Sequence, residues 1–415
     1  MTKVIECGCV IAGGGPAGLM LGYLLARAGI DVTVLEKHAD FLRDFRGDTI
    51  HPSTLEVMYE LGLLEELLTF PHNKVRRLTL QFGRERLGLV DFSGLGLRSP
   101  FIAMMPQWDF LNLIARAGAA LPNFRLAMRS EAKALVFDGD RVIGVDSATP
   151  EGLVRDVAPL VVGCDGRGSL LREQSGLPIE ILGAPMDVLW FRLPRKATDT
   201  EETMGNIAPG RMLVMLNRGD YWQCAYVITK GSHEDVTSAG LAAFQSTVGD
   251  LLPIAPQRAQ DIRSFDDVKP LTVRVDRLAK WWRPGLLFIG DAAHAMSPIG
   301  GVGVNLAIQD AVAAANVLAL PLREGRLEES HLAAVEARRR FPTRLTQSMQ
   351  VGVQNQIIAR ALSAKPDGGD FRPPLAMRMM ASMPFLNRLP AYLIGVGVRP
   401  EHVAPFIRSQ PIPTP

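Results

Sequence analysis

The sequence has few cysteines, few aromatic residues and no excess of either charge. Four cysteines in 415 residues are too few and too scattered for a disulfide framework, so we expect a reducing, cytoplasmic location. Cys7 and Cys9 lie two apart in an expected strand, and with no Cys or His pair nearby we expect them in the core and predict no metal site. Lys plus Arg number 45 and Asp plus Glu 43, a balance that gives no footprint for nucleic-acid binding.

Uninterrupted hydrophobic runs are also scarce. Residues 7–26 carry no charge, but the glycines around Gly14 break this run in the middle and Glu6 lies just ahead of it. A membrane-spanning helix or a signal-peptide core is therefore not expected there, and we predict no integral membrane segment. A hydrophobic content of 47% with 21% charged residues fits a compact protein of two or three domains.

The stretch from Gly290 to Asp310 organises the chain. The apolar residues 286–289 predict a buried parallel strand that delivers Asp291 at its tip. A proline, three glycines and an asparagine follow within eight residues, and an Ala-rich helical pattern then runs to about Leu320. A Gly-rich turn at a helix N-terminus lets backbone N–H groups approach an electron-rich ligand, and Asp291 is suited to accept hydrogen bonds from sugar hydroxyls. The alternative is a tight strand–turn–helix packed on itself.

The N-terminal residues predict a second ligand-binding turn. Residues 4–12 are typical of a strand, the sequence Gly13-x-Gly15-x-x-Gly18 follows, residues 19–28 have helical spacing, and residues 30–35 predict another strand. Glu36 ends that strand 23 residues after Gly13, where a carboxylate binds a ribose hydroxyl. This strand–turn–helix–strand–acid order favours dinucleotide binding.

Further strand tips and loops extend the expected ligand site. Residues 159–164 predict a buried strand that ends in Asp165 and Gly166, a second strand-tip carboxylate followed by glycine. Two such tips beside a dinucleotide fingerprint indicate one large ligand along one edge of a sheet. Arg46 lies in a polar loop, where it either contacts the ligand or is a solvated surface residue. Residues 52–56 look like a helix start with a capping box.

Between about residues 176 and 270 the pattern changes to strands with turn signals, which predicts an inserted antiparallel sheet. The expected fold is α/β: a Rossmann-like dinucleotide-binding domain, which the family resemblance given next identifies as an FAD-binding domain, an inserted antiparallel substrate domain and C-terminal helices. The expected boundaries are 1–74, 98–176 and 271–325 for the first domain, 75–97 and 177–270 for the second, and 326–415 for the helical region. Helical spacing from 328 to about 361 is expected to kink at Pro342.

In that order, the three motifs resemble the single-component FAD-dependent aromatic monooxygenases with the para-hydroxybenzoate hydroxylase fold. The resemblance covers roughly residues 4–340. It implies an enzyme that binds FAD, uses NADH or NADPH and O₂, and hydroxylates a phenolic or polyketide-like aromatic molecule through a flavin C4a-hydroperoxide. It assigns Arg46 to the flavin and pyrophosphate, and Pro298 to the flavin and the substrate hydroxyl; these two are the expected catalytic residues. His294 is expected to have a structural role and not to act as a base.

The expected FAD-binding residues come from the fingerprint, the two strand tips and the Gly-rich turn. They are Gly13, Gly15, Pro16, Ala17, Gly18, Glu36, Lys37, Arg46, Gln107, Asp165, Asp291, Pro298, Gly301, Gly303, Val304 and Asn305. No second dinucleotide fingerprint is present, so the nicotinamide cofactor is expected to bind transiently in a groove.

The substrate site is expected between the inserted sheet and the loop at Pro298. Alternation along residues 221–226 places Tyr221 and Gln223 on one face of a strand and Trp222 and Tyr226 on the other. A Gln beside a Tyr suits a pocket that orients a hydroxylated ring, so we predict that Tyr221 and Gln223 face the substrate. Two other functions stay open: a flavin-dependent reductase of the same fold acting on an isoprenoid, and a non-catalytic flavin-binding sensor. The sequence does not decide between a monomer and a homodimer.

Overall fold

The computed structural model describes residues 2–42, 48–365, 372–383 and 387–409. Its first large sheet has six strands in the order β21-β22-β13-β2-β3-β9. The strands from β22 to β9 run parallel and β21 pairs antiparallel at the edge. Their bounds are Trp282–Arg283, Leu286–Phe288, Val161–Gly163, Cys9–Ala12, Val32–Leu35 and Phe124–Ala127. The four inner strands are buried throughout, as expected for a parallel sheet that is covered on both faces.

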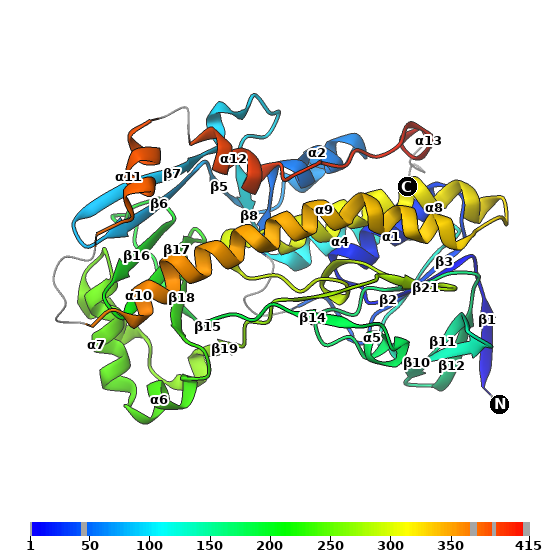
Figure 1. Ribbon diagram of the computed structural model, residues 1–415, viewed down its shortest axis with the longest axis horizontal. Coiled ribbons are helices and arrows are strands. Elements are labelled where there is room, and N and C mark those ends of the chain that lie inside the picture. Colours follow the sequence, from blue (N-terminus) through cyan, green and yellow to red (C-terminus); the bar gives the residue numbers. More distant parts are fainter. Residues whose placement is uncertain (1, 43–47, 366–371, 384–386, 410–415) are drawn as a thin grey trace.

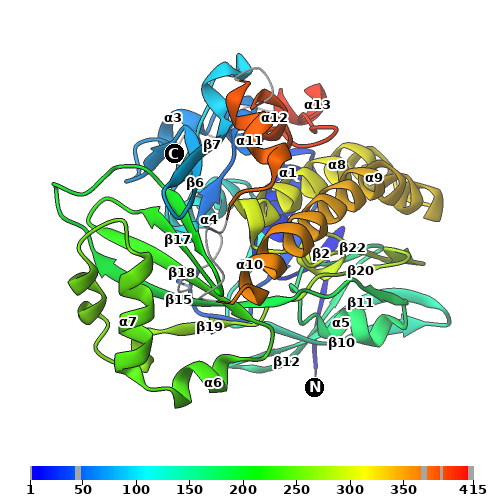
Figure 2. The ribbon, with the colours of Figure 1, turned by 60° about the vertical axis from the view of Figure 1, so that its left-hand side comes forward.

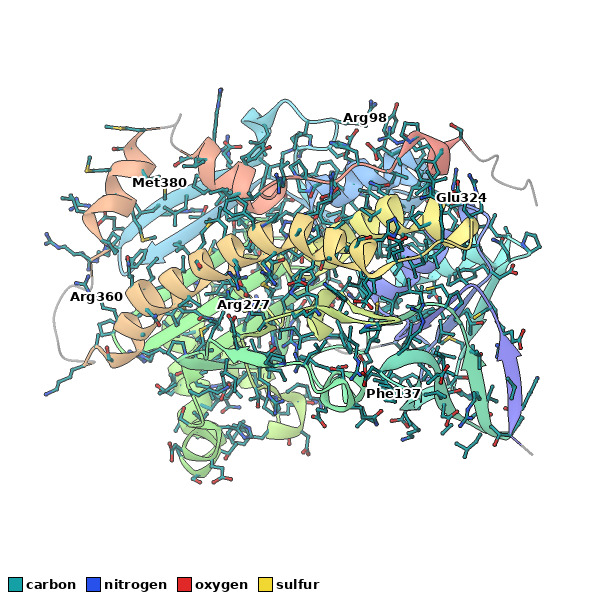
Figure 3. The ribbon with its side chains drawn as sticks, turned by 45° about the vertical axis from the view of Figure 1, so that its right-hand side comes forward. Arg98, Phe137, Arg277, Glu324, Arg360 and Met380 are labelled. Atoms are coloured by element: carbon teal, nitrogen blue, oxygen red, sulfur yellow. The ribbon has the colours of Figure 1, made fainter. Side chains whose placement is uncertain are left out.

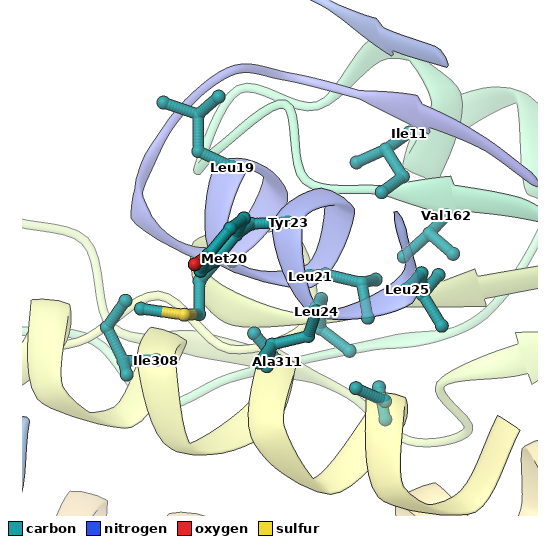
Figure 4. Packing of buried hydrophobic residues seen from close by; sticks show 14 of the residues in the cluster. Ile11, Leu19, Met20, Leu21, Tyr23, Leu24, Leu25, Val162, Ile308 and Ala311 are labelled. Atoms are coloured by element: carbon teal, nitrogen blue, oxygen red, sulfur yellow. The ribbon is translucent and has the colours of Figure 1, made fainter. Parts of the chain in front are cut away.

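Two apolar helices pack together beside this sheet. Helix α1 (Pro16–Arg27) follows the glycine fingerprint, and α8 (Gly303–Arg323) follows the second glycine-rich turn. Figure 4 shows Met20 and Leu24 of α1 against Ile308 and Ala311 of α8. The segment Ile299–Arg323 is long and apolar enough to cross a membrane by length and composition, but 78% of its apolar 18-residue window is buried inside the structure. Its hydrophobicity is therefore accounted for by the core.

A second sheet of seven strands has the order β19-β15-β18-β17-β16-β6-β7. Strand β6, from earlier in the chain, pairs with β16 of the predicted insertion, and β7 pairs with β6 at the edge of the sheet. The pairs are antiparallel except for β16 with β6. In sheet order the bounds are Lys269–Leu271, Met186–Pro194, Tyr221–Thr229, Arg211–Asn217, Met204–Ala208, Arg77–Phe82 and Glu85–Asp91. Helix α7 (Leu241–Leu251) packs on one face, and α6 (His233–Ser238), which the sequence analysis did not predict, precedes it (Figure 2).

The C-terminal region is built on one long helix. Helix α9 (Glu329–Val353) continues without interruption through Pro342, and a π-helical segment, Gln354–Ile358, follows it (Figure 1). The helix spans the molecule from the end of α8, marked by Glu324, towards Arg360 at the opposite end (Figure 3). Four short helices complete the region: α10 (Ala359–Ser363), α11 (Leu375–Ser382), α12 (Arg388–Gly395) and α13 (Pro405–Arg408).

Smaller elements connect these parts. One sheet has the order β1-β12-β11-β10, another β4-β8-β5, and a third pairs β14 with β20. Their bounds in that order are Lys3–Glu6, Gly152–Val157, Arg141–Thr149, Glu131–Asp138, Thr49–Ile50, Ile102–Met104, Asn73–Val75, Ile179–Ile181 and Asp276–Leu278. The remaining α-helices are α2 (Pro52–Glu60), α3 (Leu64–Leu67), α4 (Gln107–Ala119) and α5 (Leu170–Ser175).

The prediction of one strand over residues 4–12 is wrong. The chain leaves β1 at Glu6 and enters a different sheet at Cys9, so Cys7 and Cys9 do not share a strand. At Gly8 the backbone N–H donates to the carbonyl of Asp31 at 2.8 Å, and a Cβ would lie 2.7 Å from the Ile30 side chain. This close contact with a distant turn bends the chain, and only glycine fits there.

The predicted capping box at the start of α2 is also wrong. The N-cap residue is His51, Pro52 is the first helical residue, and no side chain caps the helix. The Ser53 hydroxyl contacts the Asn305 side chain at 2.7 Å instead of a backbone N–H of its own helix. A partner 252 positions away has therefore replaced the local bond.

Candidate functional site

The three glycines of the first turn have different surroundings. At Gly13, φ is +111° and a Cβ would lie 2.3 Å from the carbonyl oxygen of Cys164. At Gly18 a Cβ would lie 1.9 Å from the carbonyl oxygen of Gly13. Gly15 has an ordinary φ of −76°, and apart from its chain neighbours no atom of the described residues lies within 4 Å of its Cβ position. Packing of the chain therefore requires Gly13 and Gly18, whereas open space surrounds Gly15, where a ligand fits against the backbone.

Glu36 lies beside this turn at the end of β3. Its side chain is buried and accepts hydrogen bonds from the N–H groups of Gly14 at 3.1 Å and His38 at 3.0 Å. Pro16 and Ala17 form the first turn of α1, whose N-terminus has no side-chain cap, and Lys37 is exposed. The uncapped helix end leaves its N–H groups for an anionic ligand.

Asp165 and Asp291 follow the neighbouring strands β13 and β22. Arg167 donates to Asp291 Oδ2 from Nε at 3.1 Å and also contacts it through Nη2 at 3.1 Å. Asp165 Oδ1 is buried with no hydrogen-bond partner among the described residues, and burial raises the pKa of this carboxyl. A buried oxygen without a partner is costly, so it suits a site that a ligand hydroxyl completes.

Residues 298–305, called here the 298–305 turn, join the loop after Asp291 to α8. Gln350 of α9 donates to the carbonyls of Ser297 at 3.0 Å and Ile299 at 2.8 Å on either side of Pro298. The Thr49 hydroxyl donates to the Gly301 carbonyl at 2.9 Å. These bonds hold the turn from two sides.

The end of the turn is open to a ligand. Beyond its own helix and chain neighbours, no atom in the described part of the chain lies within 4 Å of a Cβ position at Gly303, the first residue of α8, and the N-cap residue Val302 provides no side-chain cap. Val304 and the Asn305 side chain are buried, and the Asn305 amide oxygen accepts bonds from α2. The first N–H groups of a 21-residue helix are thus left to stabilise negative charge.

His294 lies behind the turn in a buried charge cluster. Its Nε2 contacts Asp310 Oδ2 at 2.6 Å, and Arg339 Nε donates to Asp310 Oδ1 at 2.9 Å. Burial raises the pKa of Asp310, but His294 and Arg339 outweigh it and hold that pKa below its ordinary value. The histidine is 1% exposed, which fits the structural role expected from the sequence.

A polar connection joins the inserted sheet to the central part of the site. Gln223 on β18 is buried and accepts from Arg218 Nε at 2.7 Å, and Arg218 Nη2 donates to Asp48 Oδ2 at 2.8 Å. Asp48 Oδ1 in turn accepts from the backbone N–H of Gln107 at 3.4 Å. Burial lowers the pKa of Arg218 and raises that of Asp48, and each partner counters the shift of the other. The pair is a desolvated ion pair between two parts of the fold.

The two faces of β18 differ as the alternation predicts. Trp222, Cys224 and Tyr226 pack into the apolar cluster under α7. Gln223 and the half-buried Tyr221 lie on the opposite face, where Gln223 reaches Asp48 through Arg218. Asp48 directly precedes Thr49, which holds the 298–305 turn. The polar face of β18 is thereby connected to that turn.

Three of the residues that build this site were not singled out from the sequence. They are Arg218, Arg167 and Thr49. Each acts on a partner more than 100 positions away, so no local spacing reveals it. The signal that was available for Arg167 is its position at a strand tip. Arg46 lies outside the described residues.

Comparison with known proteins decides the family. Residues 6–349 match a family described as an FAD binding domain. The chain is 33% identical over 387 residues to 6-methylpretetramide 4-monooxygenase of Streptomyces rimosus, covering 92% of this chain and 89% of the relative. The chain belongs to the single-component FAD-dependent aromatic monooxygenases. It is an FAD-dependent enzyme of this family, as the sequence resemblance indicated.

Solved structures of the family share the fold. Para-nitrophenol 4-monooxygenase PnpA of Pseudomonas putida DLL-E4 superposes with a TM-score of 0.74 at 21% identity and covers 94% of each chain. The anhydrotetracycline hydroxylase OxyS of Streptomyces rimosus has a TM-score of 0.71 at 25% identity, covering 94% of this chain and 76% of that one. The predicted fold class is therefore confirmed, and the open positions at Gly15 and Gly303 and the orphaned Asp165 oxygen fit the FAD of this monooxygenase family.

Proposed function

We propose that this protein hydroxylates a phenolic or polyketide-like aromatic molecule, with NADH or NADPH as the electron donor and O₂ as the oxygen source. The observation that carries the proposal is the match to 6-methylpretetramide 4-monooxygenase over nearly the full length of both chains. The polar face of β18 beside the 298–305 turn supports an oriented, hydroxylated substrate.

The proposed FAD-binding carboxylates lie at the ends of three strands. Glu36, Asp165 and Asp291 would each accept a hydrogen bond from a hydroxyl group of the cofactor, and the backbone at Gly15 would bind its pyrophosphate. Bound FAD would supply the redox chemistry of the hydroxylation, with the nicotinamide as the electron donor and O₂ as the oxygen source. The N–H groups at the start of α8 stabilise negative charge next to Pro298.

The chain is proposed to orient the substrate through Gln223 and Tyr221. Gln223 is held by Arg218, so its amide points in one direction and can bind a substrate hydroxyl without reordering. The apolar residues next to it on the same face, Ala225 and Val214, would contact the aromatic rings. We propose that the inserted sheet covers the cofactor and that the domains have the bounds expected from the sequence.

The function is tested by a screen of NADH and NADPH oxidation by the FAD-loaded protein against a panel of phenols and polycyclic aromatic compounds, with product masses measured. Faster oxidation with a product heavier by one oxygen atom supports a hydroxylase. Oxidation coupled to a hydrogenated product, with O₂ unchanged, would instead support the reductase. Failure of every donor to reduce the flavin would support the sensor.

The substrate face is tested by Gln223→Leu in the presence of a substrate found in that screen. We expect a higher KM, or NAD(P)H oxidation uncoupled from hydroxylation, with normal FAD content, because the change removes the amide and keeps the volume. Tyr226→Phe on the other face is the matched control. Normal kinetics in Gln223→Leu together with a defect in Tyr226→Phe would show that the opposite face binds the substrate.

A further inference from the structure

Helix α12 lies beyond residue 349, where the match to the FAD-binding family ends, yet it packs directly behind the 298–305 turn. Ile394 contacts the apolar cluster of Met296, Val302 and Leu306, which surrounds the turn. At Gly395 a Cβ would lie 3.0 Å from the ring of Phe92 and 3.2 Å from Pro52. The helix is therefore closely fitted against the site. Figure 1 shows it next to α2.

His51 stands between this helix and the turn. Its ring is fully buried, with Nδ1 at 2.8 Å from the carbonyl oxygen of Ile394 and Nε2 at 3.0 Å from that of Gly301. Both partners are acceptors, and a neutral imidazole has one N–H to donate. Burial lowers the pKa of His51 to about 4, and the two carbonyl contacts oppose this shift without cancelling it. The ring is therefore neutral at pH 7 and satisfies one carbonyl at a time.

The carbonyls of Gly301 and Ile394 differ in whether another hydrogen-bond donor is present. The Gly301 carbonyl already accepts from the Thr49 hydroxyl at 2.9 Å. Ile394 lies in the last turn of α12, where carbonyls lack intrahelical donors, and the next backbone N–H groups, of Val396 and Gly397, both donate to Tyr392. The histidine proton therefore belongs on Nδ1, directed at Ile394.

Ser53, two residues after His51 in the first turn of α2, repeats this arrangement. Its hydroxyl has one proton and lies 2.7 Å from Asn305 Oδ1 and 3.2 Å from the carbonyl of Gly395. Thr54 supplies a second donor to the same Asn305 oxygen at 2.7 Å. The Gly301 carbonyl and the Asn305 side chain thus each accept a hydrogen bond from a threonine. His51 and Ser53 can therefore donate their protons to carbonyls of α12.

We infer that α12 is a positioning element for the 298–305 turn, and that neutral His51 links the two by holding its single proton on Nδ1 for Ile394. If α12 is displaced, Nδ1 loses its acceptor and the proton moves to Nε2, which then donates to Gly301. The tautomer of His51 thus shows whether α12 is packed against the 298–305 turn.

The test uses the FAD-loaded full chain labelled with ¹⁵N-histidine, because the ring nitrogen shifts separate the two tautomers and the imidazolium. Gly395→Leu displaces α12, since its side chain meets Phe92 and Pro52. Gly352→Leu on α9 is the matched control, because no protein atom lies within 4 Å of its Cβ position. We expect the Nδ1–H form in the wild type and the control, and the Nε2–H form in Gly395→Leu. Loss of one backing contact should also weaken FAD binding about 3- to 10-fold.

An imidazolium or an Nε2–H form in the wild type at pH 7 would overturn the inference. So would an unchanged tautomer or an unchanged FAD dissociation constant in Gly395→Leu. If that variant does not fold, Gly395→Val replaces it, because its shorter branched side chain still meets Phe92 and Pro52, and the same results decide. None of these measurements involves substrate turnover, so they are separate from the test of the proposed reaction.

Discussion

Substitutions at two glycines of the first turn separate ligand binding from folding. Gly15→Val places its side chain in space that no atom of the described residues beyond its chain neighbours occupies within 4 Å, and at φ −76° and ψ −173° the backbone suits any residue. We therefore expect the apoprotein to fold with a Tm close to that of the wild type. The new side chain occupies the volume in which the FAD pyrophosphate is proposed to lie. Overpacking of about 1–3 kcal/mol corresponds to an FAD dissociation constant raised roughly 5- to 140-fold.

Gly18→Ala is the companion change. Its methyl group would lie 1.9 Å from the Gly13 carbonyl oxygen, so the turn has to move and the apoprotein itself is expected to be destabilised. Thermal unfolding of both apoproteins and the ratio of flavin absorbance to protein absorbance measure the two effects. Wild-type FAD content in Gly15→Val, or equal loss of apoprotein stability in both variants, would refute the reasoning.

Three further predictions concern other parts of the site. Asp291→Ala removes the partner of Arg167 and a proposed hydrogen-bond acceptor for FAD. The binding free energy of FAD should therefore weaken by about 1.5–3 kcal/mol, measured by titration of apoprotein with FAD; full occupancy at low micromolar FAD would contradict this. Arg46→Ala should retain FAD but slow its reduction by NAD(P)H in stopped-flow experiments, and an unchanged rate would make Arg46 a surface residue. The pKa of His51 is about 4 in the folded state, below its unfolded value, so the unfolded chain binds a proton first as pH falls. This histidine should therefore lower the free energy of unfolding by about 2 kcal/mol between pH 7 and pH 5. Urea unfolding measures the loss, and His51→Gln should lack it.

The large elements could be predicted because their signals are local. The fingerprint at Gly13 to Gly18, the apolar run before Asp291 and the alternation along β18 each follow from a repeat within one element, and the structure contains all three. Burial on both faces makes the central strands continuous apolar runs, which are readable without knowledge of their neighbours.

The contacts that join these elements could not be predicted in the same way. The break at Gly8 arises from Asp31 in another turn, and the lost capping bond at Ser53 arises from Asn305, far along the chain. The ion pair of Arg218 with Asp48 spans 170 positions and carries no spacing signal. Such pairs depend on how the sheets pack, which periodicity within one element does not encode.

The most direct test of the central claim is the fate of O₂. The FAD-loaded protein is supplied with NAD(P)H, isotopically labelled O₂ and the aromatic compound that most accelerates NAD(P)H oxidation, and the product is analysed by mass spectrometry. The account predicts one labelled oxygen atom in the aromatic product for each NAD(P)H consumed in a coupled reaction. Product without the label, or NAD(P)H oxidation that yields only hydrogen peroxide with every aromatic compound tested, would contradict it.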